Sequence, residues 1–264
     1  MSKERVQKVL ANAGYASRRE IEKWITAGRI EVNGTKSVLG DRVDAEDTIK
    51  IDGRVIKLGD STKDNNVRVI ALNKAEGIIT TREDPQGRPT VFEKLPRLNK
   101  QRWVAVGRLD INTSGLLLMT TDGELANRLM HPSYEIEREY LVRVMGEVTP
   151  EIIRNIIKGV EIDGSMMKFG SVQVYHNQVA TKIANNGAGL YHTGKANQWY
   201  KVTLAEGKNR EVRKLWESQG LRVSRLIRTR YGPVILGKKL KAGEFRELDA
   251  NEIKELQEGG RKKS

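Results

Sequence analysis

The chain has 264 residues, of which 38% are hydrophobic and 31% charged, and this suits one or two soluble domains with hydrophobic cores. The 47 basic residues outnumber the 34 acidic ones, so the net charge of +13 indicates a polyanionic partner such as nucleic acid, or else a solubilising surface. The absence of cysteine excludes disulfides and thiolate chemistry, and neither a secretory signal nor an apolar run of the roughly 20 residues that a membrane helix needs is present. We therefore expect a cytoplasmic monomer without a membrane partner.

The first 28 residues predict two short helices. Apolar side chains recur at helical spacing in both segments, and Gly14 and Gly28 follow as helix stops. Ser17 and Glu20 fit a capping box at the start of the second helix. Short strands are expected next, around two glycine turns: Arg29–Val32 before Asn33-Gly34, then Thr48–Ile51 and Arg54–Leu58 on either side of Asp52-Gly53.

Positive charge is concentrated on these two helices. Residues 1–36 carry eight basic and four acidic side chains, whereas residues 37–60 carry four basic and six acidic ones. Arginine and lysine on such a face contact phosphate oxygens and position RNA without reading its sequence. The candidate RNA-binding residues here are Arg5, Lys8, Arg18, Arg19 and Lys23.

Beyond this module we expect a linker over 61–66, a larger domain over 67–258 and a basic tail over 259–264, with the module itself spanning 1–60. The larger domain alternates predicted strands with a few helices, which indicates an α+β fold with a mostly antiparallel sheet. Predicted strands are Val67–Leu72, Leu116–Thr120, Glu139–Val144, Val172–Tyr175, Trp199–Leu204 and Val223–Arg230. In the last of these, regular alternation would put Val223, Arg225, Ile227 and Thr229 on one face and Ser224, Leu226, Arg228 and Arg230 on the other. Predicted helices follow Asp122-Gly123 and Thr149-Pro150, span Asn209–Gln219 with Asn209 as cap, and span Asn251–Glu258. Asn177–Asn197 is expected to form a mobile hairpin or loop.

One polar, glycine-bounded loop stands out before the strand at Leu116. Gly107–Ser114 contains Asp110 beside Arg108 and two hydroxyl residues. A loop carboxylate held against a rigid strand is a plausible catalytic group. An aspartate that bonds its own turn is the commoner explanation of such a residue, and spacing alone favours that simpler role.

Two stretches resemble known families. The helix over Arg5–Gly14, Ser17-Arg18-Arg19 and the segment Gly28–Gly34 together resemble the S4 RNA-binding module. Gly107-Arg108-Leu109-Asp110, followed by Thr113-Ser114-Gly115-Leu116-Leu117, resembles the central signature of pseudouridine synthases. The resemblance implies a small S4-like module followed by a pseudouridine synthase catalytic domain with a mostly antiparallel sheet.

The same resemblance assigns roles to three side chains. It implies that Asp110 is the catalytic nucleophile. Arg138-Glu139-Tyr140 is similar to the motif that supplies an active-site tyrosine, Tyr140, on which a flipped-out uracil would stack. Glu206–Leu215 is similar to the late motif whose basic residue, Arg213, pairs with the aspartate and keeps it ionised and oriented.

The substrate class is narrowed by further segments. Arg82–Phe92 and Asn127–Pro132 resemble most the group of large-subunit (23S) ribosomal RNA pseudouridine synthases designated B. The family usually has Lys-Pro where this chain has Lys74-Ala75. Without the proline, the loop that follows Lys74 is expected to be less rigid than in the family. The resemblance implies ribosomal RNA as partner and isomerisation of uridine to pseudouridine without a cofactor.

The residues themselves indicate a second RNA surface and no metal site. Residues 201–246 carry 13 basic and four acidic side chains, which indicates a second RNA surface. Arg108, Lys208 and Arg210 are the candidate contacts near the site. No metal is expected, because the three histidines lack ligand partners at useful spacing. Alternative functions are a non-catalytic RNA-binding or ribosome-assembly protein, and an S4-bearing synthetase fragment, for which no ATP-site motif is present.

Overall fold

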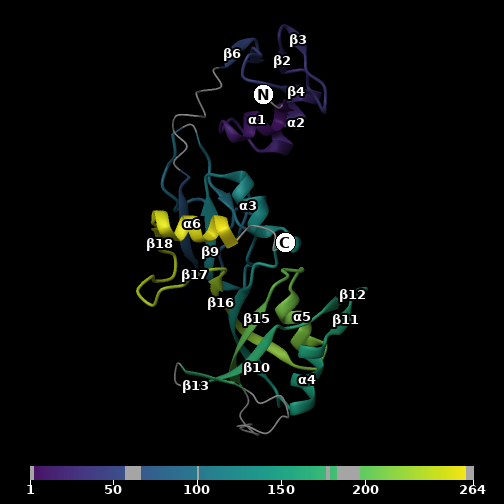
Figure 1. Cartoon of the computed structure of the whole chain (residues 1–264), viewed down its shortest axis with the longest axis vertical. Helices are drawn as coiled ribbons and strands as arrows, with labels where there is room; N and C mark the ends of the chain where they lie inside the picture. Colours follow the sequence, from purple (N-terminus) through teal and green to yellow (C-terminus); the bar gives the residue numbers. More distant parts are fainter. Residues whose placement is uncertain (1–2, 57–66, 100, 177–178, 183–196, 260–264) are drawn as a thin grey trace. The chain divides into compact units, whose positions relative to one another are not determined.

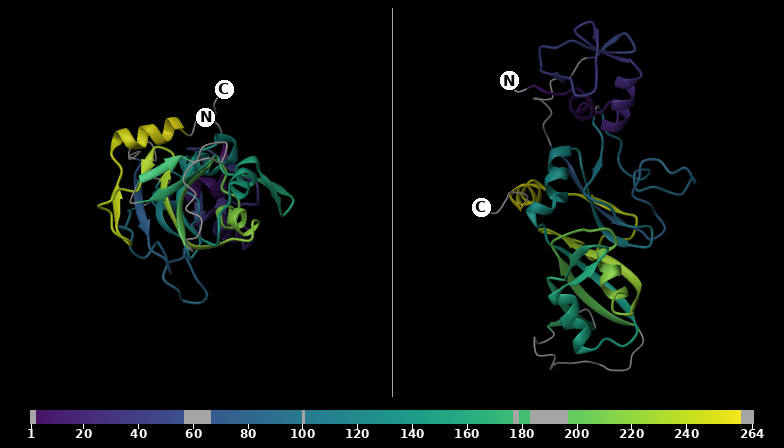
Figure 2. Two further views of the ribbon diagram at one scale, coloured as in Figure 1. Left: turned by 90° about the horizontal axis from the view of Figure 1, so that it is seen from below. Right: turned by 90° about the vertical axis from the view of Figure 1, so that its right-hand side faces the viewer.

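The computed structural model describes residues 3–56, 67–99, 101–176, 179–182 and 197–259. The chain divides into two compact units (Figures 1 and 2). The first unit contains residues 1–67 with the segments 96–103 and 121–123, and the second contains the rest. The predicted linker and most of the predicted basic tail lie outside the described residues, so these two predictions stay predictions.

The first unit combines two helices with short strands. Its elements are β1 (Glu4–Arg5), α1 (Val6–Asn12), α2 (Arg18–Thr26), β2 (Ile30–Val32), β3 (Thr35–Lys36), β4 (Arg42–Val43), β5 (Ile49–Ile51) and β6 (Arg54–Ile56). Strands β3, β2, β5 and β6 form an antiparallel sheet in that order, and β1 pairs with β4. The apolar faces of both helices meet the sheet in one core, made of Val6, Leu10, Ala11, Ile21, Ile25, Ile30, Val43 and Ile49.

Local sequence signals account for most of these boundaries. Asn33-Gly34 and Asp52-Gly53 have positive φ at both positions and connect antiparallel strands, as tight hairpin turns require. The Ser17 hydroxyl accepts a hydrogen bond from the Glu20 amide at 3.1 Å, which confirms the predicted cap of α2. The Glu20 carboxylate pairs with Lys23 at 3.1 Å instead of completing the capping box.

The second unit is built on a ten-stranded sheet, mostly antiparallel as predicted. The strand order is β14-β13-β15-β10-β16-β9-β7-β18, with β8 added to β9 and β17 added to β16. Only the pairing of β16 with β9 is parallel among the described strands of this sheet. The strands are β7 (Val69–Lys74), β8 (Val104–Ala105), β9 (Ser114–Thr120), β10 (Arg138–Met145), β13 (Ser171–His176), β14 (Val179–Lys182), β15 (Gln198–Leu204), β16 (Arg222–Tyr231), β17 (Val234–Ile235) and β18 (Phe245–Glu247).

Helices and one small hairpin cover this sheet. They are α3 (Gly123–Met130), the 3-10 turn η1 (Pro132–Tyr134), α4 (Pro150–Lys158), the hairpin β11 (Val160–Ile162) and β12 (Ser165–Met167), α5 (Glu211–Glu217) and α6 (Ala250–Gly259). Helix α5 packs against β16, and its fully buried Trp216 has a ring centroid 5.2 Å from that of Tyr200 on β15. Helix α4 contacts β13 beside it (Figure 1). The sheet is therefore covered where β10, β15 and β16 lie at its centre.

Two local predictions in this unit are wrong. Helix α5 begins at Glu211 rather than after Asn209, because Arg210 takes the left-handed conformation (φ 54°) at the cap position. The buried Glu211 carboxylate folds back to accept the Lys208 amide at 3.0 Å, so a side chain inside the helix makes the capping bond. Burial also raises the pKa of Glu211.

The second wrong prediction concerns strand β16, which does not alternate regularly. The register against β10 shifts twice, leaving Ser224 and Thr229 as extra residues, so these are β-bulges. Arg225 is therefore exposed although Val223 is buried, and the buried face runs through Val223, Leu226, Arg228 and Tyr231. These four residues lie opposite the buried face of β10, namely Val144, Val142, Tyr140 and Arg138.

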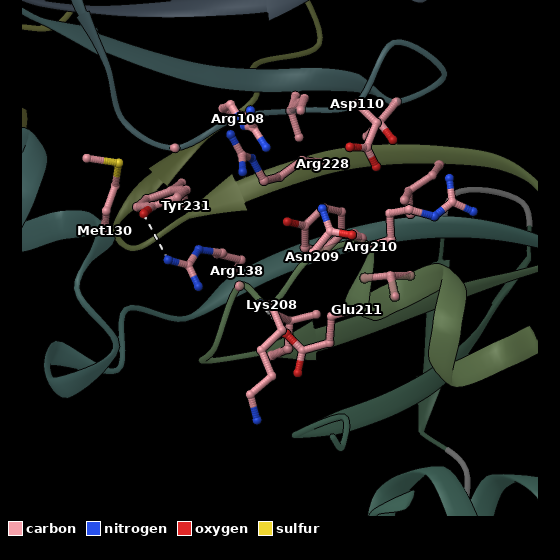
Figure 3. A pocket seen from close by; sticks show the side chains of 18 residues that line it. Arg108, Asp110, Met130, Arg138, Lys208, Asn209, Arg210, Glu211, Arg228 and Tyr231 are labelled. Atoms are coloured by element: carbon pink, nitrogen blue, oxygen red, sulfur yellow. Dashed lines mark hydrogen bonds between the residues drawn. The ribbon is translucent and has the colours of Figure 1, made fainter. Parts of the chain in front are cut away.

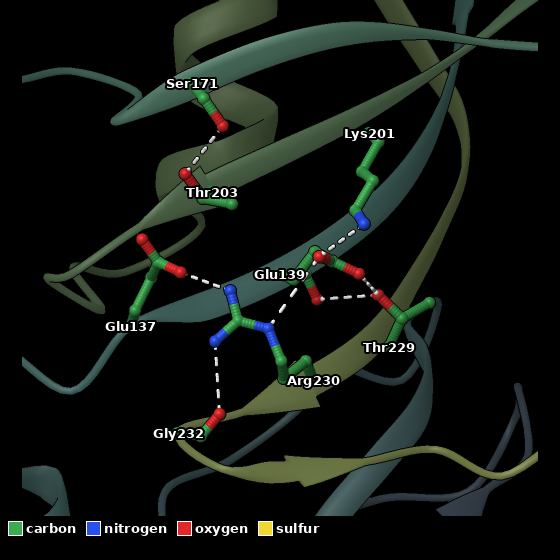
Figure 4. Close-up of polar contacts among 8 residues, drawn as sticks. All are labelled: Glu137, Glu139, Ser171, Lys201, Thr203, Thr229, Arg230 and Gly232. Carbon is green, nitrogen blue, oxygen red and sulfur yellow. Dashed lines mark hydrogen bonds and ion pairs between the residues drawn. The ribbon is translucent and has the colours of Figure 1, made fainter. Parts of the chain in front are cut away.

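The other face of the same strands carries a polar network (Figure 4). Glu139 of β10 pairs with Lys201 of β15 at 2.8 Å and accepts a hydrogen bond from the Thr229 hydroxyl of β16 at 2.7 Å. Arg230 pairs with both Glu137 and Glu139. Because these contacts cross three strands at the bulge next to Tyr140, they stabilise the register that places Tyr140 on the buried face.

Candidate active site

The Asp110 loop is held by main-chain contacts from two sides. It joins β8 to β9, and the Thr113 amide closes a turn onto the Asp110 carbonyl at 3.0 Å. The Gly77 amide donates to the Ile111 carbonyl at 2.9 Å, and the Thr80 hydroxyl donates to the Leu109 carbonyl at 3.0 Å. The backbone is therefore fixed, while the Asp110 side chain remains exposed.

Lys74 lies beneath this loop and was not predicted as a site residue. It ends strand β7 and is only 1% exposed. Its ammonium donates to the carbonyls of Thr113 at 2.7 Å, Ala75 at 3.0 Å and Asp110 at 3.1 Å. Burial lowers its pKa to about 8, against the opposing effect of Asp110 and Glu76. A lysine at the end of a strand with four consecutive apolar residues was the available sequence signal.

Arg213 is buried on α5 and reaches the same loop. One terminal nitrogen donates to the Asn112 carbonyl at 2.8 Å, and the other to the Val223 carbonyl at 3.0 Å. The expected direct pairing with Asp110 is corrected by this geometry, because the guanidinium is aligned on two carbonyls instead of the carboxylate. Burial lowers the pKa of Arg213, and the nearby Asp110 charge opposes that effect. Arg213 thus connects α5, β16 and the Asp110 loop.

Tyr140 lies at the centre of the sheet, 8% exposed, between Val202 of β15 and Arg228 of β16. Directly opposed residues in an antiparallel pair have Cβ atoms about 4.5–5.5 Å apart, so the Tyr140 and Arg228 side chains are neighbours. Arg228 was not singled out from sequence, because it stood among several arginines of one strand whose facing depends on the two bulges.

Asp110, Tyr140 and Arg228 border one cavity of about 440 Å³, a size typical of small-ligand sites (Figure 3). It opens beside Asp110 and is bordered mainly by the Asp110 loop, strand β10, strand β16 and the turn before α5. The lining residues include Arg108, Asp110, Thr113, Arg138, Tyr140, Lys208, Arg210, Leu226, Arg228 and Tyr231. The structure therefore brings Asp110 and Tyr140 to one cavity, and Arg213 supports its wall without lining it.

Basic side chains surround the opening of the cavity. Arg108 and Arg210 are both exposed, and Arg210 pairs with Glu217 at 3.4 Å. Lys208 pairs with Glu206 at 2.7 Å and also donates to the Met166 carbonyl. Screened pairs of this kind contribute little to stability and exchange readily for a phosphate.

The predicted RNA-binding residues of the first unit are mostly at its surface. Arg5, Arg18, Arg19 and Lys23 are exposed, while Lys8 is half-buried and pairs with Glu4. Within the described ranges, no group of three or more histidine, cysteine, aspartate or glutamate residues has the arrangement of a metal site. No helix in that part of the chain has the length and apolarity needed to cross a membrane.

Two known protein families match the chain, one in each of its two parts. The RNA pseudouridylate synthase family matches residues 68–218, which include most of the residues that line the cavity, and the S4 domain family matches residues 4–49. The chain belongs to the RNA pseudouridylate synthase family. It also carries an S4 domain at its N-terminal side, in agreement with both predicted resemblances.

Individual relatives in this family are similar over nearly the whole chain. The ribosomal large subunit pseudouridine synthase B of Pseudomonas aeruginosa is 52% identical over 97% of this chain, and that of Escherichia coli is 51% identical over 97%. The chain spans 62% of the length of the first relative and 82% of the second. A crystal structure described as pseudouridylate synthase matches with a TM-score of 0.62 at 24% identity, covering 96% of this chain and 99% of that one, which shows the shared fold.

Proposed function

We propose that this protein isomerises a specific uridine of large-subunit ribosomal RNA to pseudouridine, with Asp110 as the catalytic carboxylate. The observation that carries the proposal is the position of Asp110 itself. Its side chain is exposed in a cavity of nucleoside size, while its backbone is held by Lys74 and by the neighbouring turn. A rigid backbone with an accessible carboxylate is the arrangement that a pre-organised nucleophile or base requires.

The net reaction needs only groups that this cavity supplies. The C1′–N1 bond breaks and its electron pair stays on the base. The base then turns, a C1′–C5 bond forms, C5 loses its proton and N1 gains one, so the product is an isomer of the substrate. Asp110 serves as nucleophile on a flipped-out uridine, and Tyr140 provides the wall on which the extruded base stacks.

Binding of the RNA is supported by charge at two places. Arg108, Lys208 and Arg210 surround the cavity and suit the phosphates next to the flipped nucleotide. The S4 domain presents the exposed Arg18 and Arg19 on α2. Ribosomal RNA as the substrate is supported by the names of the relatives from P. aeruginosa and E. coli.

We also propose that the protein works in the cytoplasm as a monomer and without a cofactor. The isomerisation transfers no electrons and no external group, so it makes no demand on a redox or group-carrying cofactor. A cysteine-free composition is compatible with a reducing compartment.

The test is the substitution Asp110→Asn, which keeps the shape of the side chain and removes its charge. We expect pseudouridine formation, mapped by carbodiimide modification of large-subunit RNA, to fall by at least about 10³-fold, as loss of a nucleophile does. Affinity for the RNA should stay within about twofold, since binding rests on the basic residues. Glu151→Gln, an exposed carboxylate on α4, is the matched control. Equal modification by the two variants would exclude the catalytic role and leave the non-catalytic RNA-binding alternative.

A further inference from the structure

We propose that Arg228 binds the uracil ring of the target nucleotide and stabilises the negative charge that the ring acquires when the C1′–N1 bond breaks. The inference rests on the proposed isomerisation at Asp110. It adds to the site a cation that contacts the base, distinct from Arg213, which contacts carbonyls behind the Asp110 loop.

The strand order puts Arg228 between the two groups proposed to hold the nucleotide. On one side its cross-strand partner in β10 is Tyr140. On the other side its partner in β9 is Gly115, five residues after Asp110, in the parallel part of the sheet. A Cβ atom on Gly115 would lie 2.7 Å from the Arg228 amide nitrogen, so only glycine allows the strands this close. Arg228 therefore belongs to the floor of the cavity (Figure 3).

The guanidinium of Arg228 is held in a fixed orientation. Its Nε donates to the Leu116 carbonyl at 2.7 Å, and the group lies over the Tyr231 ring at 5.1 Å from the centroid. Tyr231 is itself fixed, because its hydroxyl donates to the Leu129 carbonyl at 2.7 Å and accepts from Arg138 at 3.1 Å. A donor that is positioned before the substrate arrives is the arrangement that electrostatic catalysis requires.

One terminal nitrogen of this guanidinium has no partner. Arg228 is 2% exposed, and its Nη2 is buried without a hydrogen bond in the described part of the chain. Arg138, the other buried arginine lining the cavity, differs because its two terminal nitrogens donate to the Ala205 carbonyl and the Tyr231 hydroxyl. Buried charged donors are ordinarily satisfied, so an unsatisfied one on a residue that lines a cavity indicates a missing ligand acceptor.

Depth identifies the ligand atom as a base oxygen rather than a phosphate oxygen. Phosphates are strongly hydrated and continue into the flanking RNA, so they suit the exposed Arg108 and Arg210 at the opening. The flipped base is the part of the nucleotide that enters furthest. Uracil presents two carbonyl oxygens, and the electron pair left on N1 after bond cleavage delocalises onto them. A buried guanidinium next to these oxygens stabilises that anion more than it stabilises the neutral base.

The experiment compares Arg228→Gln and Arg228→Lys with Arg154→Gln, an exposed arginine on α4 that serves as the matched control. Single-turnover rates and affinities are measured on RNA that carries uridine or 5-fluorouridine at the target position. Rates are followed as loss of the N-linked nucleoside after digestion. Fluorine makes the departing base anion more stable, so the rate on 5-fluorouridine should depend less on Arg228.

We expect Arg228→Gln to lower the rate on uridine by about 10²-fold, the effect of removing one oxyanion donor, with a loss several times smaller on 5-fluorouridine. Arg228→Lys keeps the positive charge, so its rate should lie between the rates of Arg228→Gln and wild type. If Arg228→Gln does not fold, the two substrates are compared with Arg228→Lys instead. Affinity should change by less than about threefold. Equal rate losses on the two substrates would overturn the proposal, as would a loss confined to affinity, which would indicate a phosphate contact. Wild-type protein without activity on uridine would instead refute the proposed function.

Discussion

At the residue scale, Lys74 is a cation whose ammonium is surrounded by main-chain oxygens. Its contacts with Ala75, Asp110 and Thr113 make it the support of the Asp110 loop. The protein contacts replace water only in part, so burial favours the neutral amine and lowers the pKa to about 8 from an ordinary value of 10.5. The buried Lys74 beneath the Asp110 loop is therefore a group that loses its charge within the accessible pH range.

This pKa shift predicts a stability change with a definite sign. Between pH 8 and 10.5 the unfolded chain keeps the Lys74 proton while the folded protein has lost it, so the free energy of unfolding from this group rises with pH. The slope is at most about 1.4 kcal/mol per pH unit. Denaturant unfolding of wild type and Lys74→Met should be measured across this range, and the free energy of unfolding of wild type minus that of Lys74→Met should increase with pH. In addition, ¹³C labelling of lysine should show one side chain titrating near pH 8. A pH-independent difference would contradict this prediction.

At the scale of elements, the parallel pairing of β9 with β16 joins the Asp110 loop to the strand that carries Arg228. The pairing is short, Ser114 with Ile227 and Gly115 with Arg228, and Gly115 has a φ of 102° that other residues rarely adopt. The remaining neighbours of these strands are antiparallel. The position of the loop relative to Tyr140 thus depends on one glycine.

Gly115→Ala is predicted to lower the free energy of unfolding by roughly 2–6 kcal/mol, since backbone strain and overpacking each cost about 1–3 kcal/mol. The new methyl group would meet the Arg228 backbone with no room to move. Gly164→Ala is the control, because Gly164 also has positive φ (69°) but open space around a new Cβ. Urea denaturation should give a cost near 1 kcal/mol for the control. Equal costs at the two sites would show that the strands can separate.

At the scale of the whole molecule, exposed positive charge is found both on the S4 domain and around the opening of the cavity. The S4 helices carry exposed arginines, and the opening of the cavity carries Arg108 and Arg210. Binding through such residues releases counterions from RNA, so affinity falls as salt concentration rises. The net charge of +13 sets the sign of this dependence, and the position of each arginine sets its contribution.

Removing two exposed arginines of α2, in the variant Arg18→Ala/Arg19→Ala, should weaken RNA binding and lower the slope of log affinity against log salt by about 0.7 for each lost contact. The matched control is Lys36→Ala/Arg54→Ala, which removes two exposed charges from the edge strands β3 and β6. Filter binding at several salt concentrations gives both slopes. Equal slopes for the two double variants would place the RNA contact of the S4 domain elsewhere.

Local chemistry explains which features were predictable. Asn33-Gly34, Ser17 and Thr149-Pro150 have conformational preferences strong enough to define turns and helix starts without tertiary contacts. Asp110 and Tyr140 were predicted as site residues because they lie within long motifs. The family that these motifs indicated is confirmed, and the catalytic roles of the two residues stay predictions. The predicted cap at Asn209 was wrong because Arg210 takes the left-handed conformation at the cap position, and the Glu211 carboxylate binds the Lys208 amide in the preceding turn.

The chain sequence by itself determined the S4 module, the mostly antiparallel α+β class and the family, because these depend on local propensity, charge and contiguous motifs. It also predicted Asp110 as the catalytic carboxylate. Only the tertiary structure decided that Lys74 supports the Asp110 loop, that Arg213 contacts carbonyls, and that Arg228 faces the cavity. The physical reason is register. Two bulges in β16 determine which of its arginines are buried, and bulges arise from pairing between strands about 80 residues apart, which no local pattern encodes.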